Sequence, residues 1–395
     1  MHEQEADTTS PAATLAQPPT TPLPPWLMRL CGWMALLVYS VGAAAQVEAV
    51  YLAQGAYPSY VLAVLALLAL GWIAVGVHEA GHALAARIAG MIIPTLSWGR
   101  IEIALQRRGF RMRWAPRPAG RLGHVVAVPP VAVWDSKKFL WVIAGGVLAN
   151  AFTAFLALTL AWATPLEWLS WCALGFAALN ISFAIANLLP FFQGNASDGL
   201  QLLVLLRARP GAWPDPASRV ISLSVADREI PADLLAQTDA MGPHGQLLAC
   251  YVRMKMAQVE GAWQASLQHA EQQARIEAAM PPAVLAGVAR MSALLRHETA
   301  FSRAVIERDP HFCAWLPRNR DIAWLVPHMA PRCQALAAAL QGDAARMESQ
   351  LKAARRLADN SLERSVASGE ARLAEHIRAI CADAEVNQPT RFANA

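Results

Sequence analysis

Long uncharged runs fill the first half of the chain, between Leu27 and Phe192. The sequence as a whole is 55% hydrophobic and only 16% charged, which is too apolar for an ordinary soluble protein of 395 residues. A membrane-spanning helix needs about 20 mostly apolar residues. The runs therefore predict four membrane spans, at about 27–45, 60–86, 139–163 and 171–192.

The basic residues give these four spans one consistent orientation. Lysines and arginines are frequent between the second and third spans, whereas the other two connections carry only Glu48 and Glu167 as charged residues. Because basic loops stay in the cytoplasm, the second connection and both chain ends are predicted to be cytoplasmic. We expect a multi-pass protein of the cell inner (cytoplasmic) membrane that contacts lipid and does not bind nucleic acid.

The segments outside the spans complete the expected architecture. Residues 1–25 are polar and proline-rich, which predicts a disordered tail. The remaining chain divides into a transmembrane domain, a linker, a soluble helical domain and a tail, at 26–206, 207–230, 231–385 and 386–395. The expected fold class is mainly α: a polytopic membrane protein with about four transmembrane helices, a cytoplasmic β-hairpin and a C-terminal soluble α-helical domain.

The β-hairpin is expected at Ile101–Trp114, where apolar and polar residues alternate around Arg108-Gly109. An irregular basic loop lying on anionic lipid is the alternative. In the soluble domain, amphipathic segments that follow a glycine loosely resemble helical-hairpin repeats, although the full pattern of a known repeat is missing. That domain is either a site for a protein partner or a plain helical bundle.

The second span contains the sequence His78-Glu79-x-x-His82. Residues four apart lie on one face of a helix, so two imidazoles can hold one Zn²⁺ while the glutamate reaches a water on the metal. Ionisable groups inside an apolar helix are costly and usually functional. The alternative is a pair of packed histidines with Glu79 hydrogen-bonded between helices.

A zinc site needs a third protein ligand, and the sequence offers two candidates. Glu102 follows His82 at the spacing of thermolysin-like soluble enzymes, but those carry the glutamate on a second helix and Glu102 lies in a predicted strand. Asp198 follows the fourth span, which ends on the same side of the membrane as the second. It is the preferred ligand, and a loop residue or helix N-cap is its alternative role.

These motifs resemble the site-2 protease family of intramembrane zinc metalloproteases. The resemblance rests on HExxH in an apolar helix, followed by Asn-x-x-Pro and Asp-Gly at the end of a later one, and covers about residues 27–206. Gly146-x-x-x-Asn150 in the third span is similar to another family element. One departure is the stretch Phe191–Ser197 before Asp198, which is longer than the family pattern and leaves the geometry of that ligand open.

The resemblance implies a zinc metalloendopeptidase that hydrolyses a peptide bond in or near a transmembrane segment, in regulated intramembrane proteolysis. The hairpin is similar to a family element that pairs with an extended substrate. The residues carried over are the zinc ligands His78, His82 and Asp198, the general base Glu79, and Asn150 and Asn187 as supports for the substrate or its reacting carbonyl.

Two other functions stay open. A non-enzymatic membrane adaptor would bind zinc structurally and recruit partners through its C-terminal helices, but a structural site has no need of the general base Glu79. A protease could also act on a membrane-associated peptide, such as a leader or a toxin. Zinc content and activity on a transmembrane substrate distinguish the enzyme from the adaptor.

Overall fold

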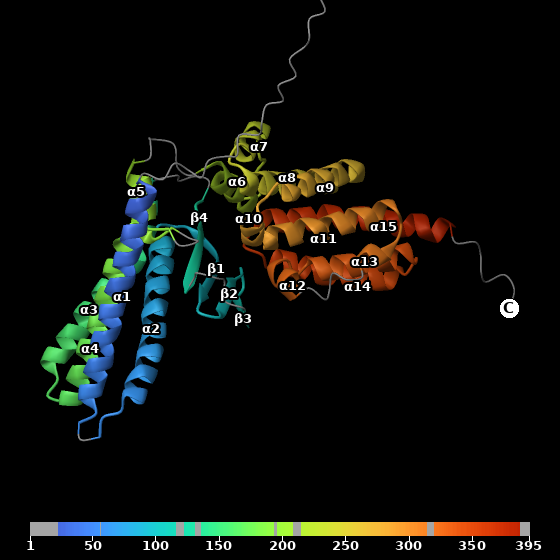
Figure 1. The fold of residues 1–395 in the computed structure, drawn as a ribbon. Helices are drawn as coiled ribbons and strands as arrows, with labels where there is room; N and C mark the ends of the chain where they lie inside the picture. Colours follow the sequence, from blue (N-terminus) through green and yellow to red (C-terminus); the bar gives the residue numbers. More distant parts are fainter. Residues whose placement is uncertain are drawn as a thin grey trace, which may run out of the picture. The chain divides into compact units, whose positions relative to one another are not determined.

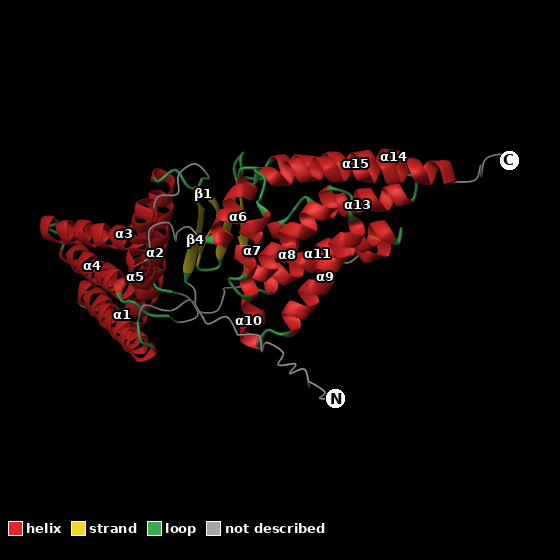
Figure 2. Cartoon of the chain, turned by 90° about the horizontal axis from the view of Figure 1, so that it is seen from above, coloured by secondary structure: helices red, strands yellow, loops and turns green. Residues whose placement is uncertain are grey.

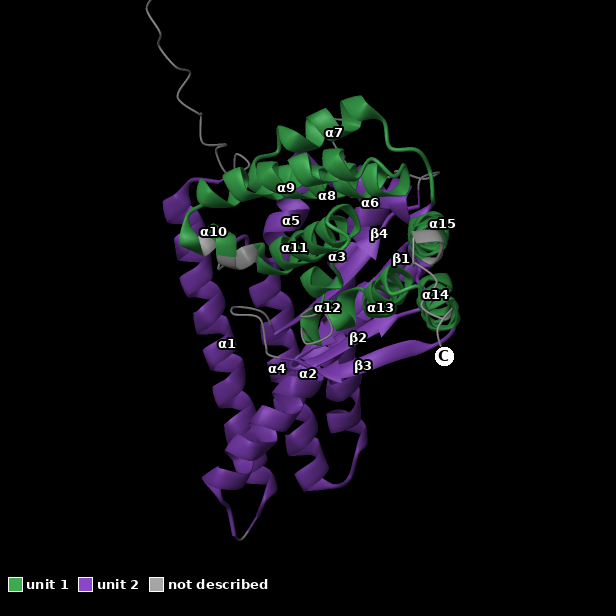
Figure 3. Ribbon diagram, turned by 90° about the vertical axis from the view of Figure 1, so that its right-hand side faces the viewer, with its two compact units in different colours: residues 1–21, 227–359, 364–395 green, residues 22–226, 360–363 purple. Residues whose placement is uncertain are grey.

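The computed structural model describes residues 23–55, 57–115, 122–130, 136–192, 196–207, 215–313 and 320–387. The described chain is mainly helical and carries one small antiparallel sheet (Figures 1 and 2). It divides into two compact units (Figure 3): unit 2 holds residues 22–226 and 360–363, and the described part of unit 1 lies within residues 227–359 and 364–395. The predicted N-terminal tail lies almost wholly outside the described residues, as does most of 386–395.

Unit 2 contains the four helices that are long and apolar enough to span a membrane, as the sequence predicts. They are α1 (Pro25–Ala53), α2 (Tyr60–Ile88), α3 (Ser136–Ala163) and α4 (Glu167–Leu188). α1 runs past the predicted end at 45, because small and apolar residues continue its helical face. α4 ends before the predicted 192, since Pro190 cannot continue a helix.

The sheet of unit 2 has four antiparallel strands in the order β3-β2-β1-β4. The predicted hairpin is present as β2 (Ile101–Leu105) and β3 (Phe110–Trp114). β1 (Ile92–Trp98) and β4 (Gly123–Val128) were not expected from the sequence. Pro94 interrupts the alternation of β1, and the register shifts between Ile92 and Thr95 where that proline has no N–H to donate.

An aromatic pair fixes the sheet against α2. The Trp72 ring of α2 stacks on the Trp98 ring of β1, with 3.6 Å between the ring centroids. Trp98 Nε1 also donates a hydrogen bond of 2.6 Å to the Trp72 carbonyl oxygen. Trp72 precedes His78 by less than two helical turns, so the sheet lies beside the part of α2 that carries HExxH.

Two short helices follow α4 in unit 2. The first is α5 (Asp198–Arg207). The second, α6 (Pro216–Val225), occupies part of the stretch 207–230 that the sequence treats as a linker. Asp215 caps α6 by accepting a hydrogen bond from the Ser218 backbone N–H, and Pro216 begins the helix. Aspartate followed by proline is a recognisable start signal for a helix.

Unit 1 is helical throughout its described residues. Its elements are α7 (Ala232–Asp239), α8 (Pro243–Val259), α9 (Trp263–Ala278), α10 (Pro282–Gly287), α11 (Ala289–Ile306), the 3-10 helix η1 (Pro310–Cys313), α12 (Arg320–Leu325), α13 (Met329–Leu340), α14 (Ala344–Asp359) and α15 (Arg364–Asn387). α8 packs on α9, and α13 packs on α14 and α15. Its largest buried apolar cluster includes Phe301, Leu336 and Ile377. Unit 1 therefore contains helical hairpins, and these pairs do not by themselves define a repeat family.

Candidate metal centre

Three side chains from two elements of unit 2 meet in one cluster. His78 and His82 lie one turn apart on α2, and Asp198 is the first residue of α5. Asp198 Oδ2 lies 3.1 Å from His78 Nε2 and 3.4 Å from His82 Nε2, and the two Nε2 atoms are 3.1 Å apart. His78 and Asp198 are buried, and His82 is nearly so. The three atoms form a compact triangle.

The second nitrogen of each imidazole is already engaged. His78 Nδ1 lies 2.7 Å from Asn150 Oδ1, and His82 Nδ1 lies 2.8 Å from the Val142 carbonyl oxygen. Both partners are hydrogen-bond acceptors, which favours a proton on Nδ1 over the longer contact of 3.3 Å from the Gly146 N–H to His82 Nδ1. In a neutral ring of this tautomer Nε2 presents a lone pair. Such second contacts fix the tautomer and orientation of metal-binding histidines.

The cluster fits one divalent metal ion. When both rings are neutral with the proton on Nδ1, two nitrogen lone pairs face buried Asp198 Oδ2, whose contacts at 3.1 and 3.4 Å are with these same two nitrogens. Three electron-rich atoms this close repel one another unless a proton or a metal cation lies between them. Tetrahedral zinc ligands at about 2.0–2.1 Å are about 3.3–3.4 Å apart, close to the separations measured here. Two imidazoles and one carboxylate leave a fourth position open.

Asn150 supports the cluster from α3. It is fully buried, and its amide nitrogen donates to the Ala74 carbonyl oxygen at 3.1 Å and to Asn180 Oδ1 at 2.8 Å. With its oxygen on His78, all its hydrogen bonds are directed into the protein. The structure thus places Asn150 behind His78, a candidate metal ligand, whereas the sequence predicts a substrate-supporting role for it.

Gly146 explains the spacing of Gly146-x-x-x-Asn150. A Cβ atom at this position would overlap His82 Nε2 and would lie 2.7 Å from His78 Nε2. One helical turn further on, Asn150 reaches His78. On α3, Gly146 therefore leaves room for the two imidazoles, and Asn150 supplies a hydrogen-bond acceptor one turn away.

The long stretch before Asp198 is closed by hydrogen bonds at its ends. The Ser197 backbone N–H donates to the Phe191 carbonyl oxygen at 3.0 Å, and Ser197 Oγ accepts from the Phe191 N–H at 3.1 Å. Ser197 Oγ also donates to the Leu189 carbonyl oxygen at 2.7 Å. Gly199 lies so close to the end of α4 that a Cβ atom there would overlap the Leu188 carbonyl oxygen. These contacts hold Asp198 beside α4 in spite of the extra residues.

Glu79 lies between the metal ligands in the sequence and is buried. Its carboxylate packs against Gly123 at the start of β4, where a Cβ atom would come within 2.5 Å of Glu79 Oε1. β4 pairs only with β1 among the described residues, so it forms one edge of the sheet. The glutamate thus lies next to an edge strand.

Two residues weighed in the sequence lie elsewhere. Glu102 is buried in β2, and its Oε2 accepts hydrogen bonds from Arg113 of β3 at 2.6 and 2.8 Å. It is an ion-pair partner within the hairpin rather than a member of the metal cluster. Asn187 is half-buried, its Nδ2 donates to the Phe183 carbonyl oxygen, and its side chain hydrogen-bonds Tyr39 of α1.

Sequence reasoning did not single out Ser197 or Gly123 as parts of the site. Ser197 directly precedes the predicted ligand Asp198, and this position in the sequence was its only indication of a role. Gly123 carries no motif, because its role depends on a strand pairing between distant segments.

Comparison of the chain with family models, with curated proteins and with solved structures finds no match.

Proposed function

We propose that this chain is an intramembrane zinc metalloprotease of the site-2 protease type. The observation that carries the proposal is the cluster of donor atoms from His78, His82 and Asp198. The two histidines share with Glu79 a helix that is apolar enough to span a membrane. Structural zinc sites are closed by four protein ligands, whereas catalytic sites keep one position open for water. Three ligands with the buried carboxylate of Glu79 nearby therefore favour a hydrolytic site over a structural one.

The proposal places α1–α4 in the cell inner membrane, with the sheet and both chain ends in the cytoplasm. The basic residues of β3 and of the turns beside it support this orientation. The cluster lies on the last turns of α2, close to the end of the helix that leads into the sheet. Water from the cytoplasm then has a short path to the site.

The chemistry divides between the metal and the chain. Zn²⁺ when bound lowers the pKa of a coordinated water toward about 7 and polarises a carbonyl. Glu79 accepts a proton from the attacking water on its carboxylate and delivers it to the nitrogen of the leaving amine. Asn150 and the Val142 carbonyl hold the imidazoles in register throughout, since they bind the Nδ1 protons.

An extended substrate would pair with β4. A helical segment hides its carbonyl groups in its own hydrogen bonds, so it must unwind before it is cut. The hairpin that the sequence predicts to bind the substrate, β2 and β3, lies at the opposite edge of the sheet. β4 is the edge strand that packs on Glu79. Strand addition at β4 would bring a scissile carbonyl to the metal and satisfy the unwound backbone.

Three variants test the proposal. Glu79→Gln is expected to keep zinc and lose cleavage, and Asp198→Ala is expected to lose zinc. Glu102→Ala serves as the control that keeps zinc, because its partner is Arg113. Metal analysis of the purified proteins gives the zinc content, and comparison of membrane proteomes reports the substrate as a span that accumulates uncut with Glu79→Gln.

Full cleavage by Glu79→Gln would refute the protease. A wild-type chain that holds zinc, with no membrane protein or peptide accumulating when Glu79 is replaced, would favour the non-enzymatic adaptor instead.

A further inference from the structure

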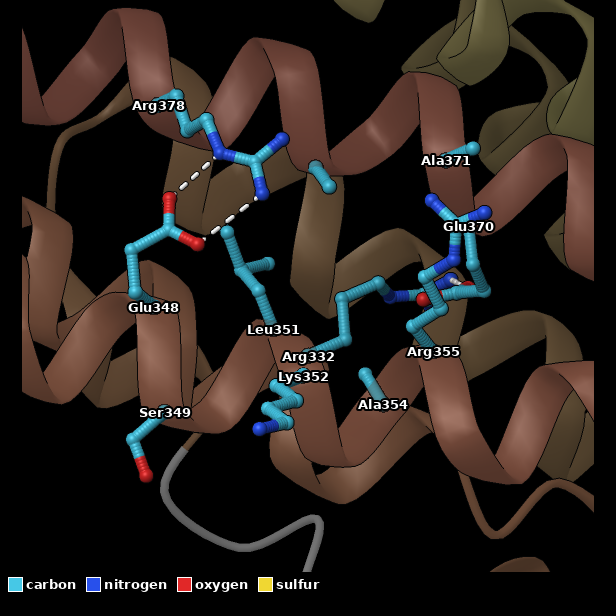
Figure 4. A pocket seen from close by; sticks show the side chains of 11 residues that line it. Arg332, Glu348, Ser349, Leu351, Lys352, Ala354, Arg355, Glu370, Ala371 and Arg378 are labelled. Atoms are coloured by element: carbon cyan, nitrogen blue, oxygen red, sulfur yellow. Dashed lines mark hydrogen bonds and ion pairs between the residues drawn. The ribbon is translucent and has the colours of Figure 1, made fainter.

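Unit 1 has a pocket that the proposed protease does not use. Its volume is about 420 Å³, within the range of about 300–1,000 Å³ typical of small-ligand sites. Arg332 reaches the pocket from α13, and the other lining residues come from α14 and α15 (Figure 4). Its apolar walls are Leu351, Ala354, Ala371 and Ala374. The pocket therefore has room for a ligand with a short apolar body.

The rim of the pocket has an excess of positive charge. Arg378 is matched by Glu348, with hydrogen bonds of 2.5 and 3.1 Å. Lys352 has no hydrogen-bond or ion-pair partner among the described residues. Arg355 has only an exposed contact of 3.6 Å with Asp359, and such surface pairs contribute little. Two cations at the rim are thus available to a ligand.

The buried side of the pocket contains an incompletely bonded guanidinium. Arg332 is fully buried, and it donates at 2.6 Å both to Glu298 Oε2 and to Glu370 Oε1. Its Nε is buried without a hydrogen-bond partner among the described residues. A buried donor that lacks an acceptor is costly. Because Arg332 lines the pocket, an acceptor oxygen that reached Nε from it would remove that cost.

We propose that this pocket binds a small oxyanion, a carboxylate or a phosphate carried on a short apolar body. Arg332 Nε donates to an anion oxygen, while Lys352 and Arg355 supply charge-assisted hydrogen bonds from the rim. The alanine and leucine side chains contact the apolar part. Glu348 and Glu370 oppose this charge only weakly, since each is already paired with an arginine.

Calorimetric titration of the purified full-length chain in detergent tests this site, with inorganic phosphate and with succinate at constant ionic strength. One saturable site is expected. The double variant Lys352→Gln/Arg355→Gln should bind at least about tenfold more weakly, since two charge-assisted hydrogen bonds are lost. Ala371→Leu fills the cavity without changing the charge and should weaken binding as well.

The matched control is Arg275→Gln/Arg303→Gln, which removes two exposed positive charges elsewhere in unit 1. It should bind the anions as the wild type does. Equal weakening by this control, or heats no larger than those of chloride, would overturn the proposal. Binding of a glutamate-rich peptide but of neither small anion would also overturn it, in favour of a docking site for an acidic protein segment. The stronger of phosphate and succinate identifies the ligand class.

Discussion

Gly146 is a position where the cluster of His78, His82 and Asp198 leaves no room for a side chain. We predict that Gly146→Ala lowers zinc affinity by at least about tenfold, because its Cβ would displace the His82 imidazole. Gly71→Ala is the matched control: it lies on α2 with open space around it, so the same substitution should leave zinc affinity unchanged. Competition with a chelator measures both. Equal affinities for the two variants would contradict the assigned role of Gly146.

The two asparagines carried over from the family resemblance should behave differently. Asn150→Ala removes the acceptor that orients His78, so we expect a loss of zinc affinity of about 10–100-fold, as for other second contacts of metal ligands. Asn187→Ala should leave zinc affinity unchanged, since Asn187 bonds to Phe183 within α4 and to Tyr39. Zinc titration of both variants measures these affinities. A loss of zinc affinity in Asn187→Ala but not in Asn150→Ala would mean that Asn187 is the residue that supports the site.

Ser197 holds the connection between α4 and α5 in place. We predict that Ser197→Ala weakens zinc binding, because three hydrogen bonds to its hydroxyl are lost and each contributes about 0.5–1.5 kcal/mol. Ser197→Thr keeps the hydroxyl and should restore much of the affinity. If the Ser197→Ala and Ser197→Thr variants bind zinc equally well, the connection does not depend on the hydroxyl group of Ser197.

The apolar helices and the HExxH motif were predictable because their signals are local. Span length follows from one run of residues, and two histidines four apart share a face wherever the helix forms. β1 and β4 were not predictable, since β1 contains Pro94 and pairs with a strand more than twenty residues away. The place of Asn150 likewise required the packing of α3 on α2, which a single sequence does not reveal.

Unit 1 should become less stable as the pH falls. In unit 1, burial is the largest influence that lowers the pKa of His328, to about 4, and Arg332 and Lys255 contribute. The unfolded chain has an ordinary histidine pKa of about 6.5. Between these values the unfolded chain binds a proton that the folded unit excludes. The free energy of unfolding therefore falls as the pH is lowered through this window.

We predict a loss of up to about 1.4 kcal/mol per pH unit from His328 between pH 6 and pH 4.5. Above about pH 6.5 both states are neutral and the effect vanishes. The pKa of Glu298 is also lowered, to about 2, so its own contribution is lost only in stronger acid. Scanning calorimetry of the wild type and His328→Gln should show a shallower pH dependence for the variant. Identical slopes would show that His328 is not buried in its neutral form.

The hydrogen bonds between Phe191 and Ser197 have a consequence for how such proteins diverge. They hold Ser197 beside Phe191, so the location of Asp198 depends on these two residues more than on the number of residues between them. Over evolution, insertions and deletions in this connection would be neutral for the ligand set. A search pattern that fixes the number of residues between proline and aspartate would overlook such chains. A pattern that asks for Ser-Asp-Gly anywhere shortly after Asn-x-x-Pro would still recognise them.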